Sequence, residues 1–300
     1  MEDLERIKDR LENIQSVEPI VTSLRTIAMG GWQVALRRMR ASNAYLAHLS
    51  EVLRVLVPLV SEDDLRRALV VRRATPLRPA MLVIASERGL CGAYNDVVLT
   101  GAERLIAEQQ VRSDLVQVAA LGSRAAAHFT SRGWPLLLSE ALPVTRVPSW
   151  GLVRGLAARL IGLLGQGEID GIYVIGAPYQ ATATPEPVSR LWLPIDASVL
   201  PVDEEPVWPQ PIVETDPHPM FRQAVADRAL VSLYRMVMES SASEQSARYR
   251  AMDSATSNLA RLIEELTLAY HTARQHAITM EMLDLIGGTG GLRGPGAPPR

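Results

Sequence analysis

The sequence from Met220 to Ile286 reads MFRQAVADRALVSLYRMVMESSASEQSARYRAMDSATSNLARLIEELTLAYHTARQHAITMEMLDLI and contains neither Gly nor Pro. Apolar and small residues recur in it at alternating spacings of three and four, the pattern of a coiled-coil seam. They are Met252, Ala255, Leu259, Leu262, Leu266, Ala269 and Ala273. At ~1.5 Å per residue, such a helix extends over roughly 100 Å, too far for one compact domain to cover. We therefore expect a partner helix along its length.

The N-terminal part carries a second, less regular seam. Its apolar positions are Leu4, Ile7, Leu11 and Ile14, and later Leu46, Leu49, Leu53, Leu56 and Val60. After Ile14 the apolar residues are Val17, Val21, Leu24 and Ala28, so that two spacings of three follow each other and predict a stammer. Pro19 lies at this slip and should kink or break the helix, and Gly30-Gly31 is a second weak point. A helix of roughly 55 residues here would pair antiparallel with the C-terminal one.

The middle of the chain has shorter, alternating elements. Strands are expected at Ala80–Ala85, Leu115–Leu121, Ile169–Ile175 and Val188–Pro194, and helices near residues 93–110, 123–132 and 151–164. Strands that alternate with helices predict a mostly parallel sheet. The expected fold is therefore α/β, a Rossmann-like domain inserted between the two helices of a long antiparallel coiled coil. The expected boundaries are a coiled-coil helix at 1–75, the Rossmann-like domain at 76–216, the second coiled-coil helix at 217–287 and a Gly/Pro-rich tail at 288–300.

Composition narrows the function. Of 300 residues 47% are hydrophobic, the formal net charge is -2 and the pI is about 6.2, which makes no general case for binding nucleic acid. One cysteine excludes an internal disulfide framework. The N-terminal residues lack the pattern of a signal peptide, and no apolar run is long enough to predict a membrane span.

Residues Ser86–Asn95, SERGLCGAYN, directly follow the first expected strand. Alone they allow a phosphate-binding turn, a turn presenting a nucleophilic cysteine, or a Cys91 whose pKa is lowered at a helix N-terminus. Each is weak, because the glycine spacing is wrong and no histidine is marked as a base. A tight turn with a buried thiol is the favoured interpretation. The sequence also has no P-loop, C-x-x-C, H-E-x-x-H or paired-carboxylate motif, so we expect no catalytic residue, cofactor or metal.

Two segments resemble the gamma subunit of F-type ATP synthases. The segment Ser243–Gly288 resembles its C-terminal helix, most specifically between Ala273 and Glu281. The turn Ser86–Asn95 resembles that family's S-D-R-G-L-C-G-x-x-N. Ile14–Val17 and Leu24–Ala28 resemble the family more weakly, and the likeness covers nearly the whole chain.

The resemblance implies the fold and the function. The chain would be the rotor shaft in the central stalk, coupling ion-driven rotation of the membrane ring to ATP synthesis or hydrolysis in the alpha/beta hexamer. It would be a non-catalytic subunit. Its partners would be the alpha and beta subunits, the epsilon subunit and the rotor c-ring, on the cytoplasmic face of the cell membrane.

The resemblance also implies sites on this chain. Residues matching those that contact beta-subunit loops are Arg274, Gln275, Thr279 and Glu281. The shaft tip in an apolar bearing would be formed by Leu283, Leu285 and Ile286. The family turn near the catalytic head comprises Arg88, Gly89, Leu90, Cys91 and Gly92.

Several features depart from the family. Glu18, Pro19 and Ile20 stand where basic residues are usual, Met280 replaces a Gln, and the tail continues past Gly287-Gly288. Two alternatives therefore stay open. One is a coiled-coil adaptor that no longer rotates, and the other is a Rossmann-like enzyme that uses Cys91.

Overall fold

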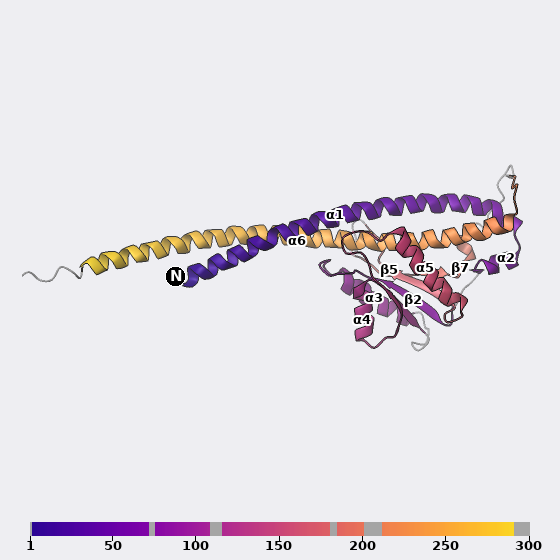
Figure 1. Ribbon diagram of the computed structural model, residues 1–300, viewed down its shortest axis with the longest axis horizontal. Helices are drawn as coiled ribbons and strands as arrows, with labels where there is room; N and C mark the ends of the chain where they lie inside the picture. Colours follow the sequence, from indigo (N-terminus) through magenta and orange to yellow (C-terminus); the bar gives the residue numbers. More distant parts are fainter. Residues whose placement is uncertain (1, 72–75, 109–115, 181–184, 201–211, 291–300) are drawn as a thin grey trace, which may run out of the picture. The chain divides into compact units, whose positions relative to one another are not determined.

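The structure is a computed structural model that describes residues 2–71, 76–108, 116–180, 185–200 and 212–290 (Figure 1). The chain divides into two compact units, one of residues 1–26 and 251–300 and the other of residues 27–250. The helices α1 (Glu2–Leu56) and α6 (Pro217–Gly290) each contribute to both units. The domain boundaries expected from the sequence stay a prediction. The two compact units meet within the long helices, after residues 26 and 250, and so do not correspond to the expected domains. The tail residues 291–300 and linker residues 201–211 lie outside the described residues.

The first unit is a pair of helical segments, one from each end of the chain. On α6 the predicted seam is confirmed: Met252 is buried and the other six positions are half-buried. On α1 the half-buried positions at coiled-coil spacing are Leu4, Ile7, Leu11, Ile14, Glu18, Val21 and Arg25. In Figure 1, α6 continues beyond the first residues of α1, so its last turns have no neighbour from α1.

The predicted stammer is wrong. Val17 is 44% exposed and Ile20 is 59% exposed, while Glu18 is half-buried. The seam therefore keeps its heptad frame and places polar side chains at two of its positions, Glu18 and Arg25. Arg25 is held there by an ion pair with Asp253, 2.9 Å from Nη1 to Oδ1. A coiled coil tolerates an occasional polar residue in its seam. A heptad frame traced through apolar residues alone therefore goes wrong at such a position.

The helix also does not break at Pro19 or at Gly30-Gly31, since α1 is one α-helix from Glu2 to Leu56. Pro19 lacks a donor for the carbonyl of Gln15, but both residues are exposed, so water can satisfy that carbonyl. Gly31 has a packing role. A Cβ there would lie 3.2 Å from the side chain of Gln245, so glycine lets α6 approach α1 closely.

The second unit contains a five-stranded sheet of order β4-β3-β2-β5-β6. The strands are β2 (Pro79–Ile84), β3 (Gln117–Leu121), β4 (Leu136–Glu140), β5 (Gly171–Gly176) and β6 (Val188–Leu193). The first four are parallel, and β6 adds to β5 antiparallel at one edge. A small parallel pair, β1 (Val70–Val71) and β7 (Ile195–Asp196), lies outside this sheet.

Helices cover both faces of the sheet, as expected for a mostly parallel sheet. The side chains of β2 alternate between two cores. Ala80, Leu82 and Ile84 pack in one core with α5 (Trp150–Gly165) and the segments of α1 and α6 in this unit. Met81 and Val83 pack in the other core with α3 (Tyr94–Glu108) and α4 (Ser123–Ser131). The α/β class, the long terminal helices and the Rossmann-like insertion are therefore confirmed.

Some elements differ from the sequence prediction. The four expected strands and three expected helices are present with ends shifted by a few residues, but β4 was not expected. The smaller elements are the 3-10 turns Val57–Leu59 and Ala197–Val199 and the helix α2 (Glu62–Arg67). None of the helices described here is long and apolar enough to cross a membrane.

Candidate functional site

The turn Ser86–Asn95 connects β2 to α3 and is held together by its own polar side chains. The Ser86 amide donates to Asn95 Oδ1 at 3.1 Å, and the Ser86 hydroxyl donates to the carbonyl of Arg88 at 2.6 Å. Asn95 Nδ2 lies 3.2 Å from the sulfur of Cys91. Leu90, although not a glycine, has a φ of 62° and is 63% exposed. The turn therefore presents Leu90 outward while Cys91 points into the protein.

Helix α6 closes over the inner side of this turn. Arg248 Nη2 donates to the carbonyls of Arg88 and Gly89 at 3.2 and 3.4 Å. The same guanidinium pairs with Glu244 at 2.7 Å, and each of the two side chains is only 11% exposed. Burial raises the pKa of Glu244, and the nearby Arg248 opposes this rise. The Arg248–Glu244 pair is thus a buried clamp between α6 and the turn.

The helix is buried on all sides where it passes the turn. Every residue from 240 to 247 is buried, and most of them are small: Ser240, Ser241, Ala242, Ser243, Ser246 and Ala247. The Tyr94 hydroxyl donates to the carbonyl of Ser240 at 3.2 Å. A Cβ on Gly176, at the end of β5, would lie 2.3 Å from Ser240 Oγ. Small residues on α6 and a glycine in the sheet therefore permit this close approach.

The environment of Cys91 argues against a reactive cysteine. Its side chain is 1% exposed and packs with Tyr94, Val98, Ala177 and Ala247. Burial raises the pKa of the Cys91 thiol, and the charge of Glu244 raises it further. A thiol in this state is a poor nucleophile. The alternative with a lowered pKa at Cys91 is therefore wrong, and the favoured buried thiol is confirmed.

Glu87 ties the turn to two neighbouring loops. Its carboxylate accepts hydrogen bonds from the amide and the hydroxyl of Ser123 and from the amide of Leu142 at 2.8 Å. Burial raises the pKa of Glu87, but these hydrogen bonds outweigh it, so the pKa lies below its usual value. Glu87 thus stays ionised and fixes the start of α4 beside the turn.

The last turns of α6, which belong to the first unit, are exposed, in contrast to the buried residues 240–247. Their large apolar side chains are exposed: Ile278, Met280, Met282, Leu283, Leu285 and Ile286. Arg274, Gln275, Thr279 and Glu281 are exposed as well. Within the described part of the chain, neither Arg274 nor Glu281 forms an ion pair. An exposed apolar helix end of this kind is typical of a surface that binds another protein.

Comparisons with known proteins cover the chain almost from end to end. A family model described as ATP synthase matches residues 3–292. The ATP synthase gamma chain of Parafrankia sp. is 31% identical over 300 residues, which cover 96% of this chain and 97% of that protein. The chain belongs to the ATP synthase gamma chain family. The gamma chain of Chlorobium luteolum is 30% identical over 296 residues, covering 98% of this chain and 100% of that one.

Solved structures of ATP synthases share the fold of this gamma-family chain. A chain in the cryo-EM structure of Euglena gracilis mitochondrial ATP synthase, OSCP/F1/c-ring, superposes with a TM-score of 0.63 at 18% identity, covering 99% of both chains. A chain in the Tetrahymena thermophila mitochondrial ATP synthase structure, central stalk/c-ring, gives 0.54 at 18% identity, covering 79% of this chain and 99% of that one.

The predicted sites of this gamma-family chain fall into two groups. Arg88, Gly89, Leu90, Cys91 and Gly92 lie together in the second unit, and the residues between 274 and 286 lie in the first. Their roles in binding partners stay predictions. Glu244 and Arg248 were not predicted as site residues, although opposite charges four residues apart within a run of small residues are a sequence signal for a buried ion pair. Among the described residues, no group of His, Cys, Asp and Glu could hold a metal.

Proposed function

We propose that this chain is the central-stalk subunit of an F-type ATP synthase, the shaft that turns inside a hexamer of alpha and beta subunits. It would couple ion-driven rotation of a membrane ring to synthesis or hydrolysis of ATP. The observation that carries the proposal is the family match from residue 3 to residue 292, which includes both long helices. The chain itself is non-catalytic, and the proposal assigns the chemistry to other subunits.

The C-terminal end of α6 is the proposed contact with the hexamer. Arg274 and Glu281 are seven residues apart and so lie on nearly the same face of the helix, whereas Gln275 and Thr279 share a neighbouring face. Leu283, Leu285 and Ile286 are between 56% and 68% exposed in the isolated chain. We propose that the polar side chains bind loops of the beta subunits and that the apolar ones turn in a bearing formed by the hexamer.

The faces of this helix carry different side chains, so rotation of the helix can affect catalytic sites at a distance. A beta subunit that faces Arg274 and Glu281 contacts charged side chains, and one that faces the opposite side of the helix contacts different residues. A shaft shifts a conformational equilibrium only by its difference in affinity for the two states. Each orientation of the helix would therefore favour a different conformation of each catalytic subunit.

We propose that the second unit binds the epsilon subunit and the rotor c-ring. The Euglena structure comprises OSCP, F1 and the c-ring, and the Tetrahymena structure comprises the central stalk and the c-ring. By analogy, the Rossmann-like unit would hold the epsilon subunit and the rotor ring. The chain would then be peripheral to the membrane through the complex, and we propose the cytoplasmic face of the cell membrane as its location.

Co-expression with the alpha and beta subunits of the same source tests this proposal. Native mass spectrometry should find a complex of three alpha, three beta and one copy of this chain, with ATPase activity. A chain that stays alone or forms only a homodimer would contradict the proposal and favour the non-rotary adaptor.

A double variant tests the proposed contact. Arg274→Ala with Glu281→Ala should lower ATP hydrolysis by the complex several-fold, because it removes two charge-assisted contacts with the beta subunits and only the difference in their strength between conformations affects the rate. The matched control is Arg261→Ala with Glu265→Ala, which removes the same charges from an exposed pair 3.9 Å apart on the same helix. Equal activity of the two double variants would contradict the role of Arg274 and Glu281.

A further inference from the structure

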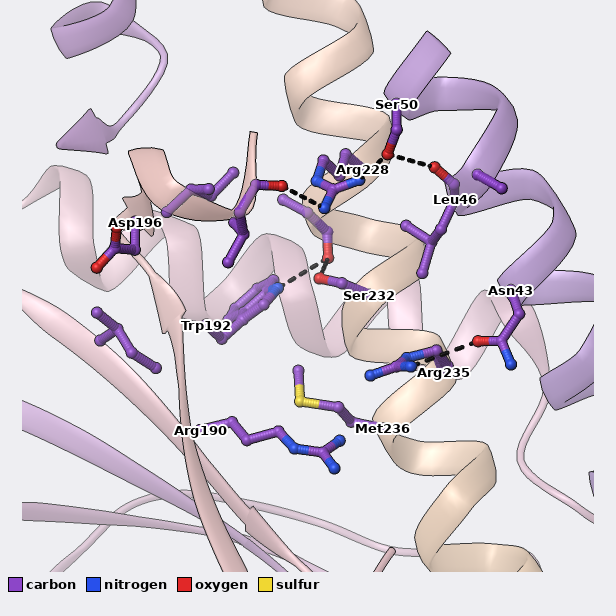
Figure 2. A pocket seen from close by; sticks show the side chains of 15 residues that line it. Asn43, Leu46, Ser50, Arg190, Trp192, Asp196, Arg228, Ser232, Arg235 and Met236 are labelled. Atoms are coloured by element: carbon purple, nitrogen blue, oxygen red, sulfur yellow. Dashed lines mark hydrogen bonds between the residues drawn. The ribbon is translucent and has the colours of Figure 1, made fainter. Parts of the chain in front are cut away.

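A cavity of about 440 Å³ lies within the second unit, between α1, α6 and the edge strand β6 (Figure 2). Asn43, Leu46 and Ser50 line it from α1, and Arg228, Ser232, Arg235 and Met236 line it from α6. Arg190 and Trp192 close it from β6. Its volume is within the range of small-molecule sites. No role predicted for this chain uses it.

Three arginines meet at this cavity. Arg228 and Arg235 are seven residues apart and therefore project from the same face of α6, and Arg190 reaches the cavity from the sheet edge. Figure 2 shows Arg228 and Arg235 along one side of the helix, with Ser232 between them. Burial lowers the pKa of the Arg228 guanidinium, and the positive charge of Arg235 lowers it further. The fold therefore holds two like charges near each other in a partly desolvated place.

The acidic groups nearby do not balance these charges. Glu239 is shared, since it pairs with Arg190 at 2.7 Å and with Arg235 at 3.5 Å. Asp196 lines the cavity, but one of its oxygens accepts from the Ser198 amide at 2.8 Å. In Figure 2 it lies on the side away from Arg228 and Arg235.

The hydrogen bonds of Arg228 and Arg235 leave donors available. Arg228 donates to neutral groups, the Ser50 hydroxyl at 2.9 Å and the Val199 carbonyl at 2.7 Å. Arg235 makes a long contact of 3.4 Å with Asn43, and its Nε is buried without a hydrogen-bond partner among the described residues. Each Nη group carries a second N–H beyond the contact that it makes, whereas the buried Nε of Arg235 has no surface that a ligand could reach. A ligand with several acceptor oxygens would accept hydrogen bonds from these remaining Nη donors.

We propose that this cavity binds a phosphate group, held between the guanidinium groups of Arg228 and Arg235. Guanidinium groups present planar pairs of donors that match the oxygens of phosphate, and a phosphate supplies the negative charge that the cluster lacks. Ser50, Ser232 and Asn43 offer further polar atoms around it. Leu46 and Met236 form an apolar part of the wall, which suits a phosphate carried by a larger molecule. This inference does not depend on the rotor function.

Calorimetric titration of the purified full chain tests the proposal, with three probes at constant ionic strength. Inorganic phosphate, AMP and vesicles of phosphatidylglycerol distinguish a free ion, a nucleotide and a lipid headgroup as the source of the phosphate. We expect at least one probe to bind with a dissociation constant of about 1 mM or lower. Absence of binding by all three up to 10-fold higher concentration, or equal heat from chloride, would overturn the proposal.

Variants locate the site. Arg228→Gln and Arg235→Gln should each weaken binding at least tenfold, whereas Arg222→Gln, an exposed arginine of the same helix outside the cavity, should leave it unchanged. Ala47→Phe adds bulk at an exposed lining position without removing a charge, so it should block binding in a folded chain even where an arginine variant fails to fold. Unchanged affinity in Ala47→Phe and in the folded arginine variants would overturn the proposal.

Discussion

Arg248 is the side chain that fastens the Ser86–Asn95 turn to α6, and its removal should be costly. Arg248→Ala deletes an ion pair of 2.7 Å and two hydrogen bonds to carbonyls and leaves Glu244 buried without its cation. Loss of one partner of a buried pair typically costs about 3–5 kcal/mol. We expect a loss of that size in the free energy of unfolding of the full chain in urea.

The control for Arg248 is an exposed pair in the same unit. Arg104 and Glu108 lie 3.3 Å apart with more than half of each side chain exposed, so Arg104→Ala should cost no more than about 1 kcal/mol. A double change, Glu244→Gln with Arg248→Met, should recover part of the loss, because no charge then stays buried. Equal effects of Arg248→Ala and Arg104→Ala would contradict the clamp.

Cys91 gives a prediction for alkaline pH. Burial raises the pKa of its thiol in the folded chain, so the unfolded thiol ionises first as the pH rises. The stability that this group contributes is complete below the unfolded pKa and is lost as the pH rises through the folded pKa. Stability should therefore fall above about pH 9 by a component that is absent in Cys91→Ala.

A thiol reagent provides the direct measurement for Cys91. At pH 8 the folded chain should react at least tenfold more slowly than the chain unfolded in urea, because the side chain is 1% exposed. Equal rates in the two states would show that the thiol is accessible. Such a result would reopen the alternative of an enzyme that uses Cys91.

The Ser86–Asn95 turn could be predicted from the sequence, but the contacts of Arg248 that hold it to α6 could not. The buried thiol follows from a glycine-rich turn after a strand, which is a local pattern. The clamp joins Arg248 to Arg88, 160 residues earlier in the chain, and only the fold brings them together. The three arginines of the cavity were missed for the same reason, since they come from β6 and from two turns of α6.

Among the elements, α6 depends on its close approach to β5. Gly176→Ala would place a Cβ 2.3 Å from Ser240 Oγ, and overpacking of this kind costs about 1–3 kcal/mol. Addition of Ser240→Ala should restore much of the loss in urea unfolding, since it removes the clashing atom. Gly155→Ala in α5 is the control: nothing lies within 4 Å of its Cβ position, so stability should rise by about 0.5–1 kcal/mol.

A double-mutant cycle tests whether the clash with Ser240 causes the loss of stability in Gly176→Ala. The losses of Gly176→Ala and Ser240→Ala should be strongly non-additive, because the two residues touch. Additive losses would mean that the alanine at position 176 acts elsewhere in the sheet.

The seam of α1 gives a second prediction about an element. If the heptad frame passes through Glu18, Glu18→Leu should stabilise the helical pair of the first unit by about 1 kcal/mol, through added apolar burial. Val17→Glu changes an exposed position, so its effect should stay within about 0.5 kcal/mol. Hydrogen exchange of the amides between residues 4 and 26 measures both effects without requiring global unfolding.

The predicted stammer makes the opposite forecast for these two variants. With Val17 in the seam, Val17→Glu would destabilise the pair and Glu18→Leu would do little. That pattern of exchange would contradict the continuous frame.

Most elements could be predicted from the sequence because their patterns are strong. The buried strands β2, β3 and β5 and the heptads of α6 are continuous and apolar or periodic over their whole length. The strand β4 was missed, since Leu136–Glu140 is short, lies at a sheet edge and ends in two polar residues. The frame of α1 was misjudged because polar residues occupy two seam positions, which only the burial of Glu18 and Arg25 reveals.

For the whole molecule, the family could be predicted from the sequence, whereas the contacts with partner subunits stay predictions. The resemblance in Ser243–Gly288 and Ser86–Asn95 is confirmed by the match over residues 3–292. The roles of Arg274, Gln275, Thr279 and Glu281 stay predictions, because their proposed partners are other chains. Fold and family depend on the chain alone, but those contacts depend on an assembly.

Rotation of a single complex would show directly whether this chain turns inside the hexamer. The alpha and beta subunits would be fixed to a surface, and a bead would be attached to this chain through Arg146→Cys, an exposed position, since the native Cys91 is buried. With ATP, we predict that the bead turns stepwise in one direction and stops when ATP is removed. A complex that hydrolyses ATP while the bead stays still would contradict the account of this chain as a rotating shaft.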